Sequence, residues 1–200
     1  MKIPQLGSAI PSRGNVVSKA IGRFMLLILR WKIIGEVHNV SKIVIVVAPH
    51  TSWTDFWVGL ATKLALGLRA SWLIADTYTK WPVGNIIRWL GGIPVNRQAN
   101  NDLVSSVVGT FNVQDGLVLG ILPEGTRKKV AKWKSGFWYI AKEAGVPIQL
   151  ASLDYDKRFF EFGLVIETTE NKDSDMRKIQ EYYRSVTPRH PGKFGGEYLN

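Results

Sequence analysis

The chain has 200 residues, enough for one domain with a sizeable core, and 46% of them are hydrophobic and 11% aromatic. This composition excludes an intrinsically disordered chain, and the absence of cysteine excludes disulfides, thiolate metal sites and cysteine nucleophiles. The net charge of +10 predicts attraction to polyanions, which include nucleic acids, anionic lipids and phosphorylated substrates.

The first 35 residues are basic and contain no acidic side chain before Glu36. Proline and glycine indicate a loose arm over residues 1–14, and a helix should follow to about residue 34 and end at Gly35. The apolar run at residues 24–29 is far shorter than the ~20 residues that cross a bilayer, and it lacks the layout of a signal peptide.

This first helix is predicted to be amphipathic. At 100° per residue, Lys19, Arg23 and Arg30 fall within about 40° of one another, while apolar side chains occupy the other sides. A basic and apolar helix of this kind lies in the headgroup layer of an anionic membrane. The alternative is a helix packed on the protein's own core.

The rest of the chain alternates between predicted strands and helices. Strands are expected at about residues 43–48, 71–75, 93–95, 116–122, 147–153 and 159–166. Helices are expected at about residues 53–68, 80–91, 100–114, 136–145 and 173–186, the last capped by Asp173 or Ser174. The alternation predicts an α/β fold in which one mixed sheet is flanked by helices, with an arm and helix at residues 1–36 and the main domain at residues 37–200.

The most informative stretch follows the strand at residues 43–48 and contains His50 and Asp55. A histidine between a strand end and a helix start stands at the mouth of an α/β sheet, where ligands bind. Asp55 lies one turn into the helix, can reach back to a ring nitrogen, and would orient His50 as a general base. The alternative is structural, because Ser52 and Asp55 also have the spacing of a capping box.

Two further stretches end in a basic donor. After the strand at residues 116–122 come Pro123, Glu124, Gly125, Thr126 and Arg127. Glycine permits a close backbone turn, a guanidinium is a two-pronged donor for phosphate, and Glu124 should hold Arg127 or a substrate hydroxyl. The stretch at residues 91–97 similarly ends in Arg97. Ordinary turns are the alternative for both.

Together these stretches resemble the glycerolipid acyltransferases, the family of 1-acyl-glycerol-3-phosphate acyltransferases. The first family block, Asn-His-x-Ser-x-x-Asp, is matched at His50, Ser52 and Asp55, with Pro49 in place of asparagine. The second block resembles residues 91–97. The third, Phe-Pro-Glu-Gly-Thr-Arg-Ser, agrees at five positions, residues 123–127, and a Val-Pro-Ile strand resembles residues 146–148.

The resemblance implies an acyltransferase domain in which His50 takes the proton from a lysolipid hydroxyl and Asp55 orients it. The hydroxyl oxygen would attack the thioester of acyl-CoA or acyl carrier protein. The acceptor's phosphate or glycerol end would be bound by Ser52, Arg97, Glu124, Gly125, Thr126 and Arg127. The family needs no cofactor and no metal, and this chain shows no metal-ligand spacing.

An acyl chain needs an apolar slot, and Trp53, Phe56 and Trp57 follow the histidine close to one helix face. Such a stripe is also typical of plain core. The basic loop after Arg127 is a candidate contact for coenzyme A phosphates, a carrier protein or lipid headgroups, or is a solvated surface.

These observations predict a peripheral membrane enzyme at the cytoplasmic face, with no nucleic-acid partner because no known nucleic-acid module is recognisable. Two alternatives remain. One is acylation of a different hydroxylated lipid or lyso-aminolipid, since Pro49 and Asn96 depart from the family pattern. The other is a basic membrane-binding protein without enzymatic activity.

Overall fold

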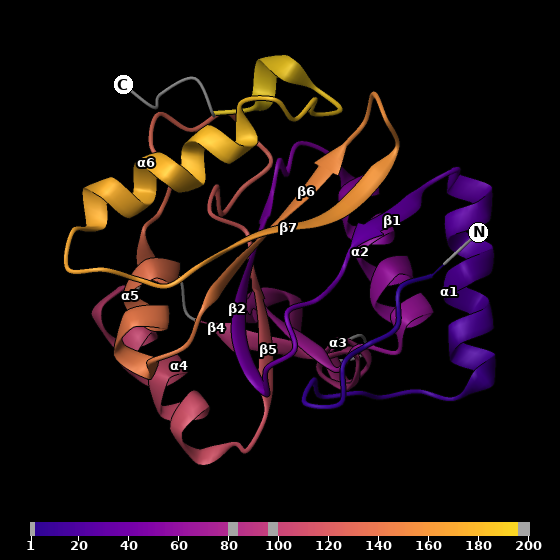
Figure 1. Ribbon diagram of the computed structural model, residues 1–200, viewed down its shortest axis with the longest axis horizontal. Coiled ribbons are helices and arrows are strands. Elements are labelled where there is room, and N and C mark those ends of the chain that lie inside the picture. The colour runs from indigo at the N-terminus through magenta and orange to yellow at the C-terminus, as the bar shows by residue number, and fades with distance from the viewer. Residues whose placement is uncertain (1–2, 80–83, 96–99, 196–200) are drawn as a thin grey trace.

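A computed structural model describes residues 3–79, 84–95 and 100–195. In these residues a mixed sheet carries helices on both faces (Figure 1). The helices are α1 (Val16–Leu29), α2 (Trp53–Leu66), α3 (Gly84–Leu90), α4 (Asn100–Val113), α5 (Gly136–Ala144) and α6 (Lys172–Tyr183), with short 3-10 turns at Asp76–Thr79 and Pro191–Lys193. The strands are β1 (Lys32–Gly35), β2 (Lys42–Ala48), β3 (Ala70–Ala75), β4 (Gly92–Val95), β5 (Leu117–Ile121), β6 (Ile148–Asp154) and β7 (Phe159–Ile166).

The sheet order is β1-β7-β6-β2-β5-β3-β4. All neighbouring strands are parallel except β6 and β7, which form an antiparallel pair. The prediction of a single-domain α/β fold with a mixed sheet flanked by helices is therefore confirmed.

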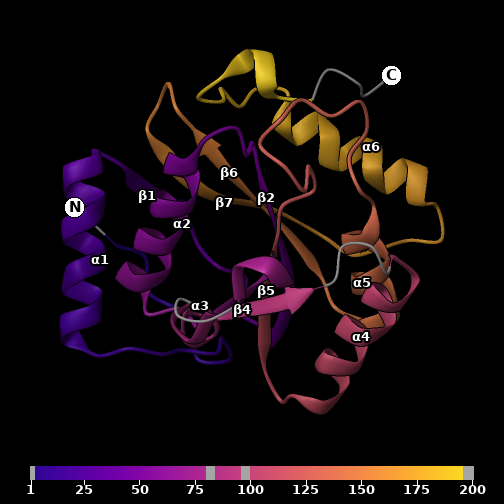
Figure 2. The same ribbon diagram turned by 180° about the vertical axis from the view of Figure 1, so that it is seen from behind.

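Strand β2 lies at the centre of the fold and is buried on both faces. Val44, Val46 and Ala48 face the core under α4, α5 and α6, whereas Ile43 and Ile45 face the core under α1 and α2. Figures 1 and 2 show these two groups of helices on opposite sides of the sheet. A strand covered on both faces reads as a continuous β-branched run, which is why its position was predictable from sequence.

The first helix was predicted too long. It ends at Leu29, because Arg30 adopts a left-handed conformation with a φ of 59° and its N–H returns to the carbonyls of the last turn. The following residues form β1, which pairs in parallel with β7 at the edge of the sheet. Pairing with a strand more than 120 residues away in the chain outweighs the local helical pattern.

Two other boundaries differ from the sequence prediction. The last helix is capped by Asn171, whose side chain accepts from the Ser174 N–H, and it ends at Tyr183 rather than near residue 186. The helix expected from residue 80 is observed as α3 from Gly84, and residues 80–83 lie outside the described part of the chain.

Helix α1 packs closely on α2 through Gly22. A Cβ at this position would lie 2.3 Å from the backbone nitrogen of Ala65 and 2.7 Å from the carbonyl oxygen of Ala61. Only glycine permits this approach, because any side chain would displace backbone rather than a flexible group. The two helices are thereby held as one layer over the sheet.

Candidate active site

Three adjacent parallel strands deliver polar side chains to one edge of the sheet. Strand β2 lies between β5 and β6 and runs parallel to both, so the carboxyl ends of all three strands meet. His50 follows β2, Glu124 follows β5 and Tyr155 follows β6. Ligands of open α/β sheets bind beyond this edge.

The helix that follows β2 begins with a capping box. The Ser52 hydroxyl accepts from the Thr54 N–H at 3.1 Å, and the Asp55 carboxylate accepts from the N–H groups of Thr51 and Ser52 at 2.8 and 2.7 Å. The structural interpretation of this stretch is thus confirmed. It does not compete with a chemical role, because the same hydrogen bonds hold the carboxylate in place.

The two residues predicted to form the catalytic pair lie together and are buried. The Nδ1 atom of His50 lies 3.3 Å from an oxygen of Asp55, and His50 is 8% exposed and Asp55 5% exposed. A proton on Nδ1 directed at the carboxylate leaves Nε2 with its lone pair, which is the arrangement of a general base. The pair can therefore accept a proton from a hydroxyl.

Glu124 is only 2% exposed, and its Oε1 atom accepts from the backbone N–H of His50 at 2.6 Å. Burial, and to a lesser degree the nearby Asp55 charge, raises the pKa of Glu124 to about 8, although the hydrogen bond from His50 opposes this. The carboxyl is therefore mostly protonated at neutral pH. The sequence predicted that Glu124 holds Arg127 or a substrate hydroxyl, whereas the contact observed is to the backbone N–H of His50.

Arg127 lies over the indole of Trp53, with its guanidinium carbon 3.5 Å from the ring centroid. Trp53 is 61% exposed, so this stacked pair stands at the surface beside the start of α2. Gly125 has a φ of 64° and forms the turn before it, and the Thr126 hydroxyl accepts from the Lys128 N–H at 3.3 Å. Stacking fixes the guanidinium plane while leaving its N–H groups in that plane.

The predicted acyl-slot residues form an aromatic row along α2. The ring of Phe56 packs edge-on against Trp57 at 5.5 Å and against Trp72 of β3 at 6.2 Å between centroids. Trp57 is 51% exposed. The other predicted binding residue, Arg97, lies outside the described residues.

Sequence reasoning missed Tyr155. Its hydroxyl donates to the second oxygen of Asp55, and burial together with this hydrogen bond raises the pKa of the tyrosine, so the hydroxyl stays protonated. Its ring also meets Trp31 edge-on, with centroids 4.8 Å apart. The strand predicted at residues 147–153 was the available signal, because a polar residue just beyond a neighbouring parallel strand reaches the same edge.

The carboxyl-terminal segment contacts two residues of the site, Tyr155 and Thr51. The Tyr155 N–H donates to the Thr187 carbonyl at 2.8 Å, and the His190 N–H donates to the hydroxyl of buried Thr51 at 3.3 Å. Arg189 lies over the Tyr155 ring at 5.7 Å. Within the described residues, no group of three or more His, Asp or Glu side chains is arranged to hold a metal ion.

A histidine–carboxylate pair at the carboxyl edge of a mixed α/β sheet has the geometry of a general base. The chain belongs to the Acyltransferase family, whose sequence profile matches residues 31–152 and so spans His50, Asp55 and the turn at Glu124. The protein is therefore an acyltransferase.

Among solved structures, the chain is similar to the 1-acyl-sn-glycerophosphate (LPA) acyltransferase PlsC from Thermotoga maritima. The TM-score is 0.61 and the identity 19%, over 83% of this chain and 75% of that chain, and at this identity the likeness establishes the fold. No curated protein sequence matches the chain significantly.

Removing the Tyr155 hydroxyl tests its role as a positioning residue. We expect Tyr155→Phe to lower kcat about tenfold, the effect of losing one hydrogen bond to a charged group. KM should stay unchanged, because the Tyr155 hydroxyl contacts Asp55 and acts only through the position of the pair. Tyr182→Phe is the matched control, since that hydroxyl contacts Ser152 and not Asp55. An unchanged kcat in Tyr155→Phe would mean that Tyr155 only packs.

Glu124 makes stability depend on pH with a defined sign. Between the pKa of an exposed glutamate, 4.5, and the folded value of about 8, the folded chain binds one more proton than the unfolded chain. Its stability contribution is complete below pH 4.5 and falls as the pH rises to 8, by up to about 1.4 kcal/mol per unit. Glu124→Gln lacks this dependence, so urea unfolding should favour the variant increasingly from pH 5 to pH 8. If the unfolding free energies of the wild type and of Glu124→Gln changed with pH in the same way, protonation of Glu124 in the folded chain would be contradicted.

Proposed function

We propose that the protein transfers a fatty acyl group from the thioester of acyl-CoA or acyl carrier protein to the hydroxyl of a lysophospholipid. The observation that carries this proposal is the buried His50–Asp55 pair at 3.3 Å, beside the stacked Arg127–Trp53 pair. The first supplies a base for a hydroxyl, and the second supplies donors for the phosphate that such an acceptor carries.

In the proposed reaction Nε2 of His50 takes the proton of the acceptor hydroxyl as the oxygen bonds to the thioester carbonyl carbon. Asp55 stabilises the imidazolium that forms. The tetrahedral intermediate then collapses with cleavage of the carbon–sulfur bond. The imidazolium proton passes to the departing thiolate, so the products are an ester and a free thiol and the histidine returns to its starting state.

In this proposal Glu124 positions the base, His50, through its backbone. Its hydrogen bond to the His50 N–H fixes the backbone that carries the ring, and its protonated state leaves Asp55 as the carboxylate that faces the imidazole. A second buried negative charge beside Asp55 would be costly, because Glu124 accepts only the one hydrogen bond from His50 among the described residues.

The acceptor's phosphate is proposed to meet Arg127, with Gly125 and Thr126 shaping the turn and Arg97 as a further donor. The acyl chain would follow the aromatic row of Trp53, Phe56 and Trp57, which starts one residue after the cap of α2 and is partly exposed. These groups have the chemistry that each part of a lysophospholipid requires.

The decisive test is acyl transfer by purified protein in detergent micelles, with acyl-CoA and acyl carrier protein as donors. We expect lysophosphatidic acid to be favoured over acceptors without phosphate, and His50→Ala to lower turnover at least about 100-fold, the usual contribution of a general base. Wild-type turnover in His50→Ala would overturn the mechanism. Preference for a lyso-aminolipid or another hydroxylated lipid would support the alternative acceptor that Pro49 leaves open.

We further propose that α1 docks the enzyme on a membrane surface. Its outer face is apolar and strongly exposed: Val16 84%, Val17 64%, Ile21 50%, Phe24 62%, Leu27 66% and Ile28 63%. Helix α1 has 14 residues, and no helix in the described part of the chain is long and apolar enough to cross a bilayer. An exposed apolar helix face flanked by basic side chains is typical of an interfacial helix.

Replacing two residues of this face should weaken vesicle binding. Phe24→Ser with Ile28→Ser removes two large exposed apolar side chains, and we expect at least a tenfold loss in flotation with anionic liposomes. Val113→Ser with Leu164→Ser is the matched control, because these apolar side chains are exposed on α4 and β7. Equal losses in both double variants would remove α1 as the docking element.

A further inference from the structure

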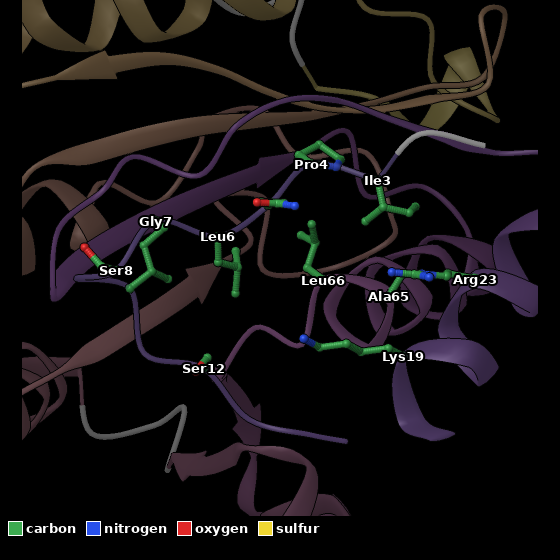
Figure 3. A pocket seen from close by; sticks show the side chains of 12 residues that line it. Ile3, Pro4, Leu6, Gly7, Ser8, Ser12, Lys19, Arg23, Ala65 and Leu66 are labelled. Atoms are coloured by element: carbon green, nitrogen blue, oxygen red, sulfur yellow. The ribbon is translucent and has the colours of Figure 1, made fainter. Parts of the chain in front are cut away.

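A cavity of about 510 Å³ lies between the amino-terminal arm, α1 and α2 (Figure 3). Its walls are the amino-terminal arm, the first half of α1 and the last turn of α2. The lining residues are Ile3, Pro4, Gln5, Leu6, Gly7, Ser8, Ile10, Ser12, Lys19, Arg23, Ala65 and Leu66. Its volume is in the range of small-ligand sites, about 300–1,000 Å³.

Two cations of α1, Lys19 and Arg23, line this cavity. Figure 3 shows both side chains extending from the helix in the same direction, toward Leu66. Among the described residues neither side chain forms an ion pair, and no acidic residue lines the cavity. Gln5, Ser8 and Ser12 add polar groups to the wall. The cavity therefore presents positive charge and hydrogen-bond donors to an anion.

The cavity adjoins the proposed docking face. At 100° per residue, the exposed apolar side chains from Val16 to Ile28 occupy an arc of about 140°, and Lys19 and Arg23 lie together along one border of it. When the apolar arc enters the acyl layer, the cations on its border stand at the level of the headgroups. Both cations line the cavity.

We propose that this cavity binds the phosphate headgroup of an anionic phospholipid from the bilayer on which α1 docks. The proposal rests on the docking of α1 and adds a specific binding site to it. The occupant is a membrane lipid rather than a soluble phosphate, because the cavity borders an exposed apolar helix face that a bilayer would cover at the same time.

This lipid is distinct from the acceptor that is acylated. The cavity is lined by Ala65 and Leu66 at the carboxyl end of α2, whereas His50 precedes its amino end. Fourteen helical residues separate the two ends by about 20 Å. A headgroup in the cavity therefore anchors and orients the enzyme without reaching the reacting atoms.

Arg23 and Arg30 form a matched pair for the test. Both are exposed cations, Arg23 within α1 and Arg30 at its C-cap, but only Arg23 lines the cavity. Arg23→Gln and Arg30→Gln therefore each remove one positive charge from the region of α1. Binding is measured by sedimentation with phosphatidylcholine vesicles that contain either phosphatidic acid or oleate, adjusted to equal surface charge. A preference for phosphatidic acid then reports recognition of its phosphate headgroup rather than of surface charge alone.

We expect the wild type to bind phosphatidic acid vesicles about tenfold more tightly than oleate vesicles, and Arg23→Gln to lose this preference. Arg30→Gln should lose about fivefold on both vesicle types, as expected for one cation near a charged surface, and keep the preference. Turnover of a short-chain soluble acceptor should be the same in Arg23→Gln and the wild type.

Each other outcome overturns the proposal in a different way. Equal losses in the two variants, or no preference in the wild type, would leave α1 docking intact without a headgroup site. Absence of vesicle binding by the wild type would overturn both the docking of α1 and the headgroup site. Calorimetric binding of inorganic phosphate that is lost in Arg23→Gln, together with no preference among vesicles, would identify a soluble ligand. Lower turnover of the soluble acceptor in Arg23→Gln would place the cavity in the catalytic machinery.

Discussion

The carboxylate of Asp55 receives hydrogen bonds from the N–H groups of Thr51 and Ser52, from the hydroxyl of Tyr155, and faces the ring of His50. The same group therefore begins helix α2, fixes the loop that leaves β2 and positions the imidazole of His50. A charge buried to this extent persists only where several donors surround it. The helix start and the His50–Asp55 pair consequently depend on the same carboxylate.

Helix α2 joins the parts of the molecule that meet a lipid in the proposed function. Its first turn holds the His50–Asp55 pair, its exposed aromatic row is the proposed acyl route, and its last turn borders the basic cavity. Its buried face packs against α1 through Gly22. A rigid helix of this kind sets fixed distances between these surfaces, which suits an enzyme whose substrates are held in a plane.

Many of the helices and strands could be predicted from the sequence because they depend on local signals. Each of these signals lies within a few residues of chain: the β-branched run of β2, the capping box at Ser52, and each short block that resembles the acyltransferase family. Strand β1 was missed because its pairing with β7 is long-range and because α1 ends at Leu29 through a left-handed Arg30, a residue type that does not signal a helix end. The contacts of Glu124 and Tyr155 could not be assigned because they depend on which strands are neighbours, and the sheet order is not a local property.

Trp31 connects the end of α1 to the residues around Asp55. It follows the end of α1 by two residues, is 1% exposed, and meets the ring of Tyr155 edge-on. The hydroxyl of that tyrosine donates to Asp55, which faces His50, so three contacts connect the residue after the cap of α1 to the imidazole. In the proposed function, the helix that would bind a membrane and the base are therefore linked by one chain of side-chain contacts.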